Sequence, residues 1–427
     1  MIWLAALLLL LAMLLGAPLF TVILGGAMLG FYATEVDLSV IAIELYSIVD
    51  TPLLSSLPLF TFAGYLLSES QTSQRVLRLV RAMFGWMPDG LAIVSLLACA
   101  MFTALTGASG VTIVALGALL LPALLKAGYQ ERFSLGLITS SGSLGLLLPP
   151  SIPLILYGII VMQIGEVSFS FSELLLSGLL PGLLMIVVLS LWVLWVHRDR
   201  PVTRTPFSWP ELRSALCAAV WEIPLPFFIL GGIFSGMMAV SEMAAIAALY
   251  VLIVEVFIYR EIKLSKLPEI TVQAMTMVGG IILILGVSMA FTSFLVDAQV
   301  PNLLFEWVKE HIDNKLTFLL LLNVFLLLLG AMLDIYAALV IVVPLILPVA
   351  MGYGIHPIHL GIIFLANMQI GYFTPPVGMN LFIASYRFKR SVSELYHASL
   401  PFMLVLLATL LLITYWPTLS LVWVDGY

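Results

Sequence analysis

Charged side chains are scarce in this sequence. Asp, Glu, Lys and Arg make up only 9% of its 427 residues, whereas a soluble domain carries roughly 25% to cover its surface. Apolar residues account for 62%, so the chain needs lipid as its solvent. A membrane span takes about 20 apolar residues, which leaves room for roughly ten spans and excludes a separate soluble catalytic domain.

Cysteine is almost absent as well. Cys99 and Cys217 both lie in apolar segments, which excludes a disulfide framework and a cysteine-based metal site, so we expect both to be packing residues. The histidines show no metal-ligand pattern, and no GxxxxGK[ST] phosphate loop occurs. We therefore expect no cofactor, no ATP-driven transport by this chain alone and, with a net charge of −6, no nucleic-acid partner.

The few basic residues are sorted by loop, which predicts the orientation in the membrane. Cytoplasmic loops are enriched in Lys and Arg. Five groups can be placed on that side: Arg75–Arg81, Lys126–Arg132, Arg198–Arg213, Arg260–Lys266 and Arg387–Arg390. The loops between them, such as Glu35 to Asp50, contain neither residue and are placed outside, together with the mixed stretch from Asp297 to Lys315.

Two apolar stretches are predicted to be re-entrant helical hairpins. Residues 91–126 carry the sequence TGASG, from Thr106 to Gly110, at their centre. Each arm then has about 15 residues and a length of ~22 Å, short of the roughly 30 Å hydrocarbon core. Residues 315–351 are interrupted in the same way from Gly330 to Asp334. The alternation of loops requires the first hairpin to enter from the cytoplasm and the second from outside.

Matching features recur at nearly constant spacing along the chain. The hairpin tips at Gly107 and Gly330 are 223 residues apart, the Pro-Pro pairs starting at Pro149 and Pro375 are 226 apart, and a third glycine pair is 220 apart. The sequence therefore predicts an inverted repeat, which is typical of transporters. The two repeats are residues 1–198 and 216–427, joined by a cytoplasmic linker at 199–215.

We thus predict an all-α polytopic membrane protein in which each half has five spans and one re-entrant hairpin. In each half one span is broken at the Pro-Pro pair, within residues 133–162 and 358–386. The symmetry requires Ile2 to Tyr32 to form two short spans that turn near Gly16. Before each hairpin, residues 71–84 and 299–310 have apolar side chains at helical spacing, which favours helices lying in the membrane interface.

The two tips and the two broken spans are the candidate functional places. Irregular backbone at membrane depth persists only where it lines a cavity or binds something, and proline frees carbonyl groups that can point at a cation. Asp334 adds an ionisable group, which at this depth indicates function by default. A lone serine or threonine usually bonds to backbone, so the clustering carries the argument. The oxygen-bearing side chains at these places are Thr106, Ser109, Thr112, Ser141, Ser143, Ser151, Thr374 and Asn380.

The chain resembles the large membrane subunit (DctM-like, M subunit) of the tripartite ATP-independent periplasmic (TRAP) transporters. Four stretches carry the resemblance: TGASGVTIVALGALLLPALLKAGY, GSLGLLLPPSIPLILYG, SEMAAIAALYVL and GYFTPPVGMNLFIAS. The resemblance implies an elevator-type transporter in the inner membrane of a bacterium or archaeon. It implies sodium-coupled import of a small organic acid, such as a C4-dicarboxylate. The implied partners are a small four-helix membrane subunit (Q type) and a periplasmic substrate-binding protein (P type), and the chain resembles the unfused form.

Carried over by position, the resemblance also implies two sodium sites. The first would lie between the first tip and the first break, with Thr106, Gly107, Ser109, Thr112, Ser143 and Gly145. The second would lie between the second tip and the second break, with Gly330, Met332, Asp334, Thr374, Pro375 and Gly378. The substrate-binding candidates are Asp334, Ser109, Ser151 and Asn380. Many family members have Asp where this chain has Thr112.

Two alternatives differ in class. One is a stand-alone sodium/organic-anion symporter of the wider group of ion transporters with paired hairpins, which needs no binding protein. The other is a membrane scaffold or channel without coupled transport. Paired oxygen-rich breaks around an intramembrane Asp argue against the scaffold, because it would gain nothing from their cost.

Overall fold

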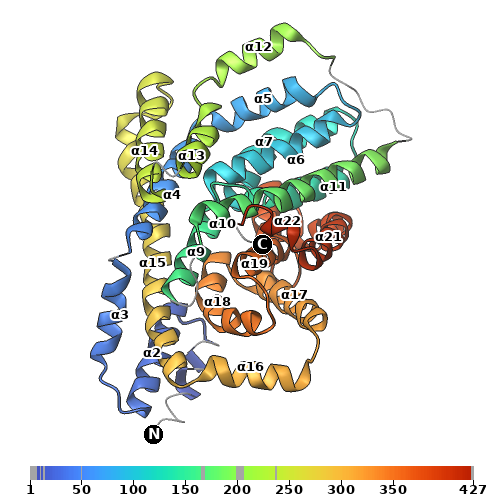
Figure 1. Ribbon diagram of the computed structural model, residues 1–427. Coiled ribbons are helices and arrows are strands. Elements are labelled where there is room, and N and C mark those ends of the chain that lie inside the picture. The colour runs from blue at the N-terminus through green and yellow to red at the C-terminus, as the bar shows by residue number, and fades with distance from the viewer. Residues whose placement is uncertain are drawn as a thin grey trace.

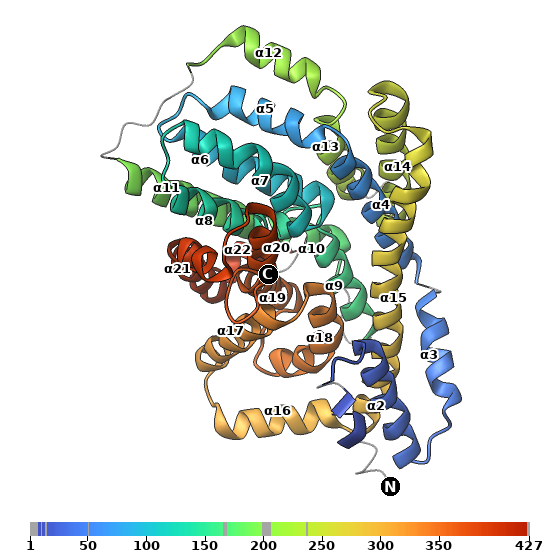
Figure 2. The ribbon, with the colours of Figure 1, turned by 180° about the vertical axis from the view of Figure 1, so that it is seen from behind.

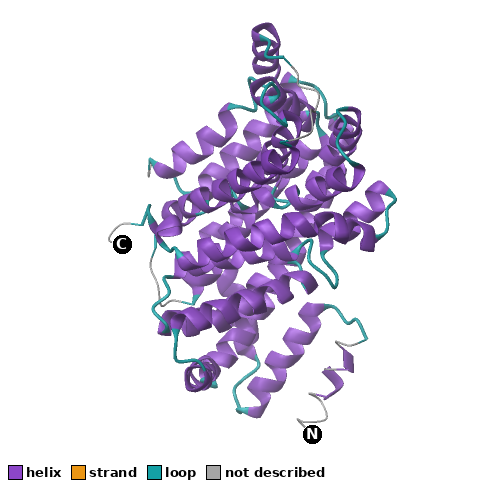
Figure 3. Ribbon diagram, turned by 90° about the vertical axis from the view of Figure 1, so that its right-hand side faces the viewer, coloured by secondary structure: helices purple, strands orange, loops and turns teal. Residues whose placement is uncertain are grey.

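The computed structural model describes residues 7–9, 11–12, 15–49, 51–164, 169–198, 206–235 and 238–424. Within these residues the regular structure is helical, without a strand (Figure 3). Seven helices are long and apolar enough to cross a membrane, or eight if the bent pair Glu131–Leu147 and Ile152–Gln163 is one span. The predicted all-α polytopic class is therefore confirmed.

One group of helices packs into a column along one side of the molecule, seen from the front in Figure 1 and from behind in Figure 2. We call this group the column. Its members are α2 (Leu19–Ala33), α3 (Ser39–Val49), α4 (Ser56–Glu69), α13 (Pro224–Phe234), α14 (Val240–Leu252) with its π-helical extension η3 (Ile253–Ile258), and α15 (Leu267–Asp297). The long α15 contacts α2, α3 and α4 along its length.

The remaining helices form a second group, the body. From the first half of the chain it contains α6 (Gly90–Thr106), α7 (Ser109–Lys126), α8 (Glu131–Ser141), α9 (Ile152–Gln163), α10 (Phe171–Ser177) and α11 (Leu179–His197). From the second half it contains α17 (Lys315–Met332), α18 (Ile335–Gly352), α19 (Pro357–Gly371), α20 (Met379–Phe388), α21 (Val392–Tyr415) and α22 (Thr418–Leu421). Every residue of α19 is buried, including the polar His359, Asn367 and Gln369, so this broken segment lies at the centre of the body.

Two helices join the column to the body. These arms, α5 (Thr72–Phe84) and α16 (Val300–His311), lie across opposite ends of the molecule (Figure 1). They confirm the helices predicted for residues 71–84 and 299–310. A further short helix, α12 (Trp209–Ala218), packs beside α5.

The chain turns where the two hairpins were predicted. α6 and α7 are 17 and 18 residues long and meet at Gly107 and Ala108, whereas α17 and α18 have 18 residues each and meet at Leu333 and Asp334. The first broken span consists of α8, the 3-10 turn Leu144–Leu147 and α9. The second consists of α19 and α20 with an irregular segment between them.

Some local predictions need correction. The outer loop expected from Glu35 to Asp50 contains α3, and only residues 34–38 connect it to α2. Two segments of the column differ in continuity. A 3-10 turn starting at Pro52 separates α3 from α4, but α15 runs without interruption for 31 residues. Cys217 is exposed on α12 because that helix lies on the surface, so only Cys99 is a packing residue.

The N-terminal segment supports a turn at Gly16. This glycine has a φ of +85°, and helical residues lie on both sides of it, at 7–12 in part and from Leu19 onward. The remainder of the predicted first short span lies outside the described residues. Gly236, its predicted counterpart in the second half, lies outside them as well.

Candidate functional site

The two hairpin tips contact one another inside the molecule. The hydroxyl of Tyr336, at the start of α18, donates a hydrogen bond of 3.2 Å to the carbonyl oxygen of Gly107. Gly107 has a φ of +70°, and a Cβ atom there would lie 2.5 Å from Cδ1 of Ile152. Only glycine fits this left-handed and crowded position without strain. The tip of the first hairpin is therefore held between α9 and the second hairpin.

The first tip also contacts the second broken span. Ser109, the first residue of α7, donates a hydrogen bond of 2.9 Å from Oγ to Oδ1 of Asn380 on α20. The backbone N–H of Asn380 donates to the carbonyl oxygen of Tyr372 at 2.8 Å, which orients the side chain. The Nδ2 atom of Asn380 is buried and has no hydrogen-bond partner. Ser109 and Asn380, predicted separately, thus form one unit that joins the two halves.

Asp334 is held by two donors at the second tip. Its Oδ2 atom accepts the backbone N–H of Tyr336 at 3.0 Å, which caps α18. Its Oδ1 atom accepts the hydroxyl of Tyr372 at 2.9 Å, and that hydroxyl accepts the backbone N–H of Ile335 at 3.0 Å. Both oxygens of this half-buried carboxyl therefore have a fixed position.

A cavity of about 540 Å³ lies where the column meets these tips. The column lines it with side chains of α4 and α15: Tyr65, Ser68, Glu69, Gln273 and Met277. The body lines it with both tips and with Tyr372, Met379 and Ile383, and both Ser109 and Asp334 belong to this lining. A volume of this size suits a small molecule, and the few polar groups around its apolar wall could fix its orientation.

A first group of oxygen atoms lies between the first hairpin and the first break. Oγ1 of Thr103 lies 2.6 Å from Oγ1 of Thr112 and donates to the carbonyl oxygen of Gly142 at 2.8 Å. A Cβ atom on Gly142 would lie 3.4 Å from the carbonyl oxygen of Ser109. Hydroxyl and carbonyl oxygens from three segments thus meet in a buried place, and hard cations prefer such ligands.

The second hairpin and the second break are in close backbone contact. A Cβ atom on Gly371 would lie 2.6 Å from the carbonyl carbon of Gly330, so the two glycines bring α17 and α19 into backbone contact. The backbone N–H of Gly378 donates to the carbonyl oxygen of Ala331 at 2.9 Å. The Oγ1 atom of Thr374 donates to the carbonyl oxygen of Ile370 at 2.8 Å. The peptide bond between Pro375 and Pro376 is cis, as is the one between Pro149 and Pro150.

The other predicted residues lie around these groups. Oγ1 of Thr106 donates to the carbonyl oxygen of Phe102, and Oγ of Ser143 donates to that of Gln369 at 2.9 Å. Ser151 caps α9 by accepting the backbone N–H of Leu154 at 3.2 Å, and it donates to the carbonyl oxygen of Leu146. A Cβ atom on Gly145 would lie 2.2 Å from the carbonyl oxygen of Ala100. The side chain of Met332 is 65% exposed.

Several site residues were missed by the sequence analysis. Tyr336 and Tyr372 flank predicted positions but were not singled out, and Thr103 was passed over although it lies one helical turn before Thr106. The cavity residues of α4 and α15, such as Glu69 and Gln273, lie far from every motif. For Thr103, the available signal was helical spacing to a predicted residue. The two tyrosines were marked only by their places beside Asp334 and within the second break.

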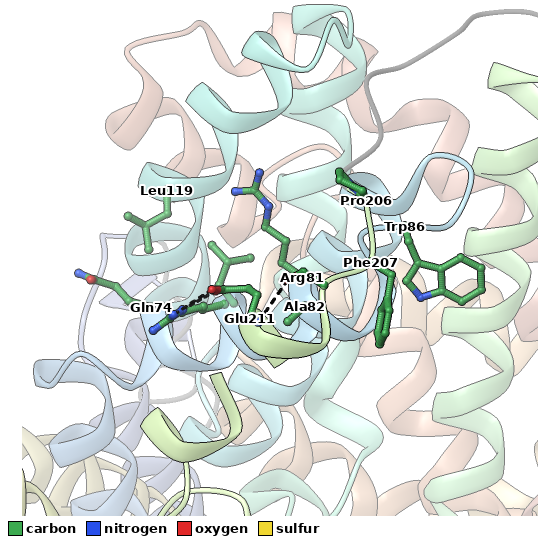
Figure 4. Close-up of a pocket in the computed structure, with 11 residues that line it drawn as sticks. Gln74, Arg81, Ala82, Trp86, Leu119, Pro206, Phe207 and Glu211 are labelled. Carbon is green, nitrogen blue, oxygen red and sulfur yellow. Dashed lines mark hydrogen bonds and ion pairs between the residues drawn. The ribbon is translucent and has the colours of Figure 1, made fainter. Parts of the chain in front are cut away.

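A second cavity, of about 450 Å³, lies between α5, α7 and α12 near one end of the molecule (Figure 4). Arg78 on its wall forms an ion pair with Glu211, with Nε and Oε1 2.7 Å apart, and Trp86 and Phe207 line its other side. None of the tip or break residues lines this cavity. It is therefore separate from the candidate site.

No group of three or more His, Cys, Asp or Glu side chains is placed to hold a metal ion in the part of the chain that the structure describes. Any cation at the tips would depend on the hydroxyl and carbonyl oxygens described above.

The fold and the site define a multi-pass helical membrane transporter with paired hairpins. A search of solved structures finds the same fold: a crystal structure of the YdaH transporter from Alcanivorax borkumensis, described as having an unusual topology, matches with a TM-score of 0.60. The two chains are 15% identical, and the match covers 88% of this chain and 87% of that one. At this identity the likeness shows the fold alone.

Sequence comparisons identify the family. Residues 1–419 match the family described as the DctM component of the tripartite ATP-independent periplasmic transporters, and the chain belongs to that family. It is 34% identical to the C4-dicarboxylate TRAP transporter large permease protein DctM of Pseudomonas aeruginosa, over 89% of this chain and 88% of the relative. It is 31% identical to the ectoine/5-hydroxyectoine TRAP transporter large permease protein UehC of Ruegeria pomeroyi, over 96% and 95%. The chain is thus a large permease subunit and not an enzyme.

Proposed function

We propose that this chain imports a small organic acid in symport with sodium ions, as the large subunit of a TRAP transporter in the inner membrane of a bacterium or archaeon. Its partners would be a small membrane subunit of the Q type and a periplasmic binding protein of the P type that delivers the substrate. The observation that carries the proposal is the cavity of about 540 Å³, where Ser109 and Asp334 lie on a wall made by both hairpin tips.

The oxygen groups beside this cavity support sodium coupling. The cluster of Thr103, Thr112 and Gly142 directly adjoins the tip that carries Ser109. An ion bound there would favour the tip conformation in which Ser109 reaches Asn380. Substrate and sodium would then bind more tightly together than apart, because each stabilises the same arrangement of the tips.

The position of the cavity supports an elevator-type movement. One wall belongs to the column and the other to the body, and the arms α5 and α16 join the two groups at opposite ends (Figure 1). If the body carries the bound substrate past the column, the cavity changes the side to which it opens. The column would remain fixed in the membrane during this movement.

The substrate class follows from the relatives only in general terms. One relative is named for C4-dicarboxylates and another for ectoines, which are small, highly polar and carboxylate-bearing molecules. The cavity has the size for such a molecule. Asn380 does not line the cavity itself, but its hydrogen bond to Ser109 holds that hydroxyl in place on the wall. The acidic Asp334 would face a cationic or hydroxyl group of the substrate, or the coupling ion.

Uptake of labelled organic acids into proteoliposomes tests the proposal. The vesicles hold this chain with its small subunit, with or without the binding protein, and with or without an inward sodium gradient. Uptake that requires both the gradient and the binding protein supports the TRAP assignment of partners and ion. Uptake by this chain alone would instead favour the stand-alone sodium/organic-anion symporter. Uptake without a sodium gradient would show that transport is not coupled to sodium.

A further inference from the structure

A buried ionic cluster lies at the start of the arm α5, away from the candidate site. Arg75 of α5 forms ion pairs with three carboxylates: Glu222 in the link between α12 and α13, Glu255 in η3, and Glu261 in the loop after η3. The side chains of Glu222 and Glu255 are 4% and 0% exposed, and that of Arg75 is 11% exposed. One element of the column, η3, and two segments that adjoin the column thus converge on one residue of the arm.

The cluster has more negative than positive charge. One guanidinium faces three carboxylates, and Arg75 is the cation that the described residues place within ion-pair distance of them. If every group were ionised, a net charge of two would lie in a largely water-excluded place. Such an uncompensated charge is costly in a low dielectric, and a buried acid group normally becomes neutral instead.

The hydrogen bonds of the cluster show where a donor is lacking. Nε of Arg75 donates to Oε1 of Glu222, Nη1 donates to Oε1 of Glu261, and Nη2 donates to both oxygens of Glu255 at 3.3–3.4 Å. The backbone N–H of Gln71 donates to Oε2 of Glu261 at 2.7 Å. These donors satisfy five of the six carboxylate oxygens. The Oε2 atom of Glu222 is buried and has no hydrogen-bond partner.

The neighbouring hydroxyl groups cannot remove this deficit. Oγ1 of Thr72 lies 3.2 Å from Oε1 of Glu222, 3.1 Å from Oε1 of Glu255 and 2.7 Å from Oγ of Ser70, but it has a single hydrogen to donate. Tyr259 presents its ring to Arg75, with the guanidinium carbon 4.0 Å from the ring centroid. Its hydroxyl donates to the carbonyl oxygen of Ala218 at 2.7 Å.

We infer that Glu222 and Glu255 share one bound proton near neutral pH, and that this proton-binding site fastens the start of α5 to the column. A proton removes one negative charge, and a neutral carboxyl group with one unpaired oxygen costs less to bury than a carboxylate with one. A metal ion would need several oxygen ligands around it, and among the described residues no three or more His, Cys, Asp or Glu side chains are placed to hold one together. The proton is therefore the ligand that the geometry accommodates.

Burial acts on Glu222 in the direction that the inference needs. Desolvation raises the pKa of this carboxyl above its usual value, although Arg75 and Thr72 act in the opposite direction. A carboxyl whose pKa is raised by folding binds its proton more tightly in the folded state. The equilibrium constant that favours the fastened state therefore falls as the pH rises from the pKa of the carboxyl in the unfastened chain to its higher pKa in the fastened one. For one proton this fall is about tenfold per pH unit.

The position of the cluster links the bound proton to the attachment of the arm α5. Arg75 lies in the first turns of α5, directly after α4, so the cluster pins the point where the chain leaves the column. Loss of the proton would leave three ionised carboxylates against one guanidinium. Their repulsion would loosen the first turn of α5. The other arm, α16, forms no ion pair among the described residues.

Infrared spectroscopy of the full chain in lipid nanodiscs tests for the proton directly. The carbonyl stretch of a protonated carboxyl group is recorded at pH 7 for wild type, Glu222→Gln and Glu255→Gln. We expect the band in wild type and its loss in at least one of the two variants. Glu211→Gln, which changes the exposed ion pair with Arg78 on the same helix pair, is the matched control and should retain the band. A band that survives in both cluster variants, or its absence from wild type, would overturn the inference.

A spin label on α5 tests the fastening. The exposed Gln74 is replaced by labelled cysteine in a chain that also carries Cys217→Ser, since Cys217 is exposed and Cys99 is buried. In the chain whose cluster residues are unchanged, we expect the mobility of the label to increase with pH. The increase should follow the titration curve of a single proton. The glutamine variant that loses the infrared band should remove this pH dependence. Mobility that does not change with pH, or that changes equally in both variants, would overturn the link between the proton and the arm.

Discussion

The hydroxyl of Tyr372 donates a hydrogen bond of 2.9 Å to Oδ1 of Asp334 and accepts one of 3.0 Å from the backbone N–H of Ile335. The phenol group of Tyr372, at the break that follows α19, therefore holds both the carboxyl and the backbone of the second hairpin tip. This relationship joins the two places that the sequence predicted separately.

Replacing Tyr372 by Phe should lower uptake by about tenfold or more. The change removes a hydrogen bond to a charged group, which contributes about 1.5–3 kcal/mol, and leaves the ring packing intact. The initial rate of uptake into proteoliposomes measures the effect. Tyr386→Phe is the control, because Tyr386 is 90% exposed, and it should behave as wild type. Equal rates in Tyr372→Phe and wild type would show that Asp334 does not depend on this hydroxyl.

Asp334→Asn should abolish uptake while the protein stays folded in the membrane. Asn is as good a helix N-cap as Asp, so the bond from the backbone N–H of Tyr336 and the start of α18 are retained. The variant thus separates the charge from the cap. Membrane abundance and uptake are measured on the same vesicles, and normal uptake by this variant would exclude a role for the charge.

Thr103→Val and Thr112→Val should each raise the sodium concentration that gives half-maximal uptake. Each substitution keeps the side-chain volume but removes one of the oxygen atoms that meet near Gly142. The sodium dependence of the uptake rate is the measurement. Thr276 lies exposed on α15 and bonds only to its own helix, so Thr276→Val should leave the dependence unchanged. An unchanged sodium dependence in both Thr103→Val and Thr112→Val would show that the coupling ion does not bind at these oxygen atoms.

Gly371→Ala should destabilise the protein and block transport, because the new Cβ atom would lie 2.6 Å from the backbone of Gly330. Overpacking of this kind costs about 1–3 kcal/mol. Gly280→Ala on α15 is the matched control, since nothing lies within 4 Å of the added atom. Thermal stability in detergent and uptake are compared for the two variants. If Gly371→Ala keeps wild-type stability, α17 and α19 are not in the backbone contact described here.

Much of the fold follows from local features of the sequence. The scarcity of charge requires a membrane environment, and the length of each apolar run limits how far it can reach across the hydrocarbon. Gly107 and the Pro-Pro pairs interrupt helices through their own backbone chemistry, wherever they are placed in space. For this reason the hairpin turns, the two breaks and the helices α5 and α16 could be predicted. The 3-10 turn at Pro52 carried a similar signal, which went unread.

The partners within the site were decided by the tertiary structure. Tyr336 reaches Gly107, and Ser109 reaches Asn380, across sequence separations of 229 and 271 residues. Arg75 meets Glu222 and Glu255 across 147 and 180 residues. Such contacts depend on how the two halves and the column pack, and hydropathy has no information about which faces of two distant helices meet. The sequence by itself therefore determined the membrane class and the broken elements, because these depend on neighbouring residues. Only the packing decided which oxygen and nitrogen atoms face each other at the tips.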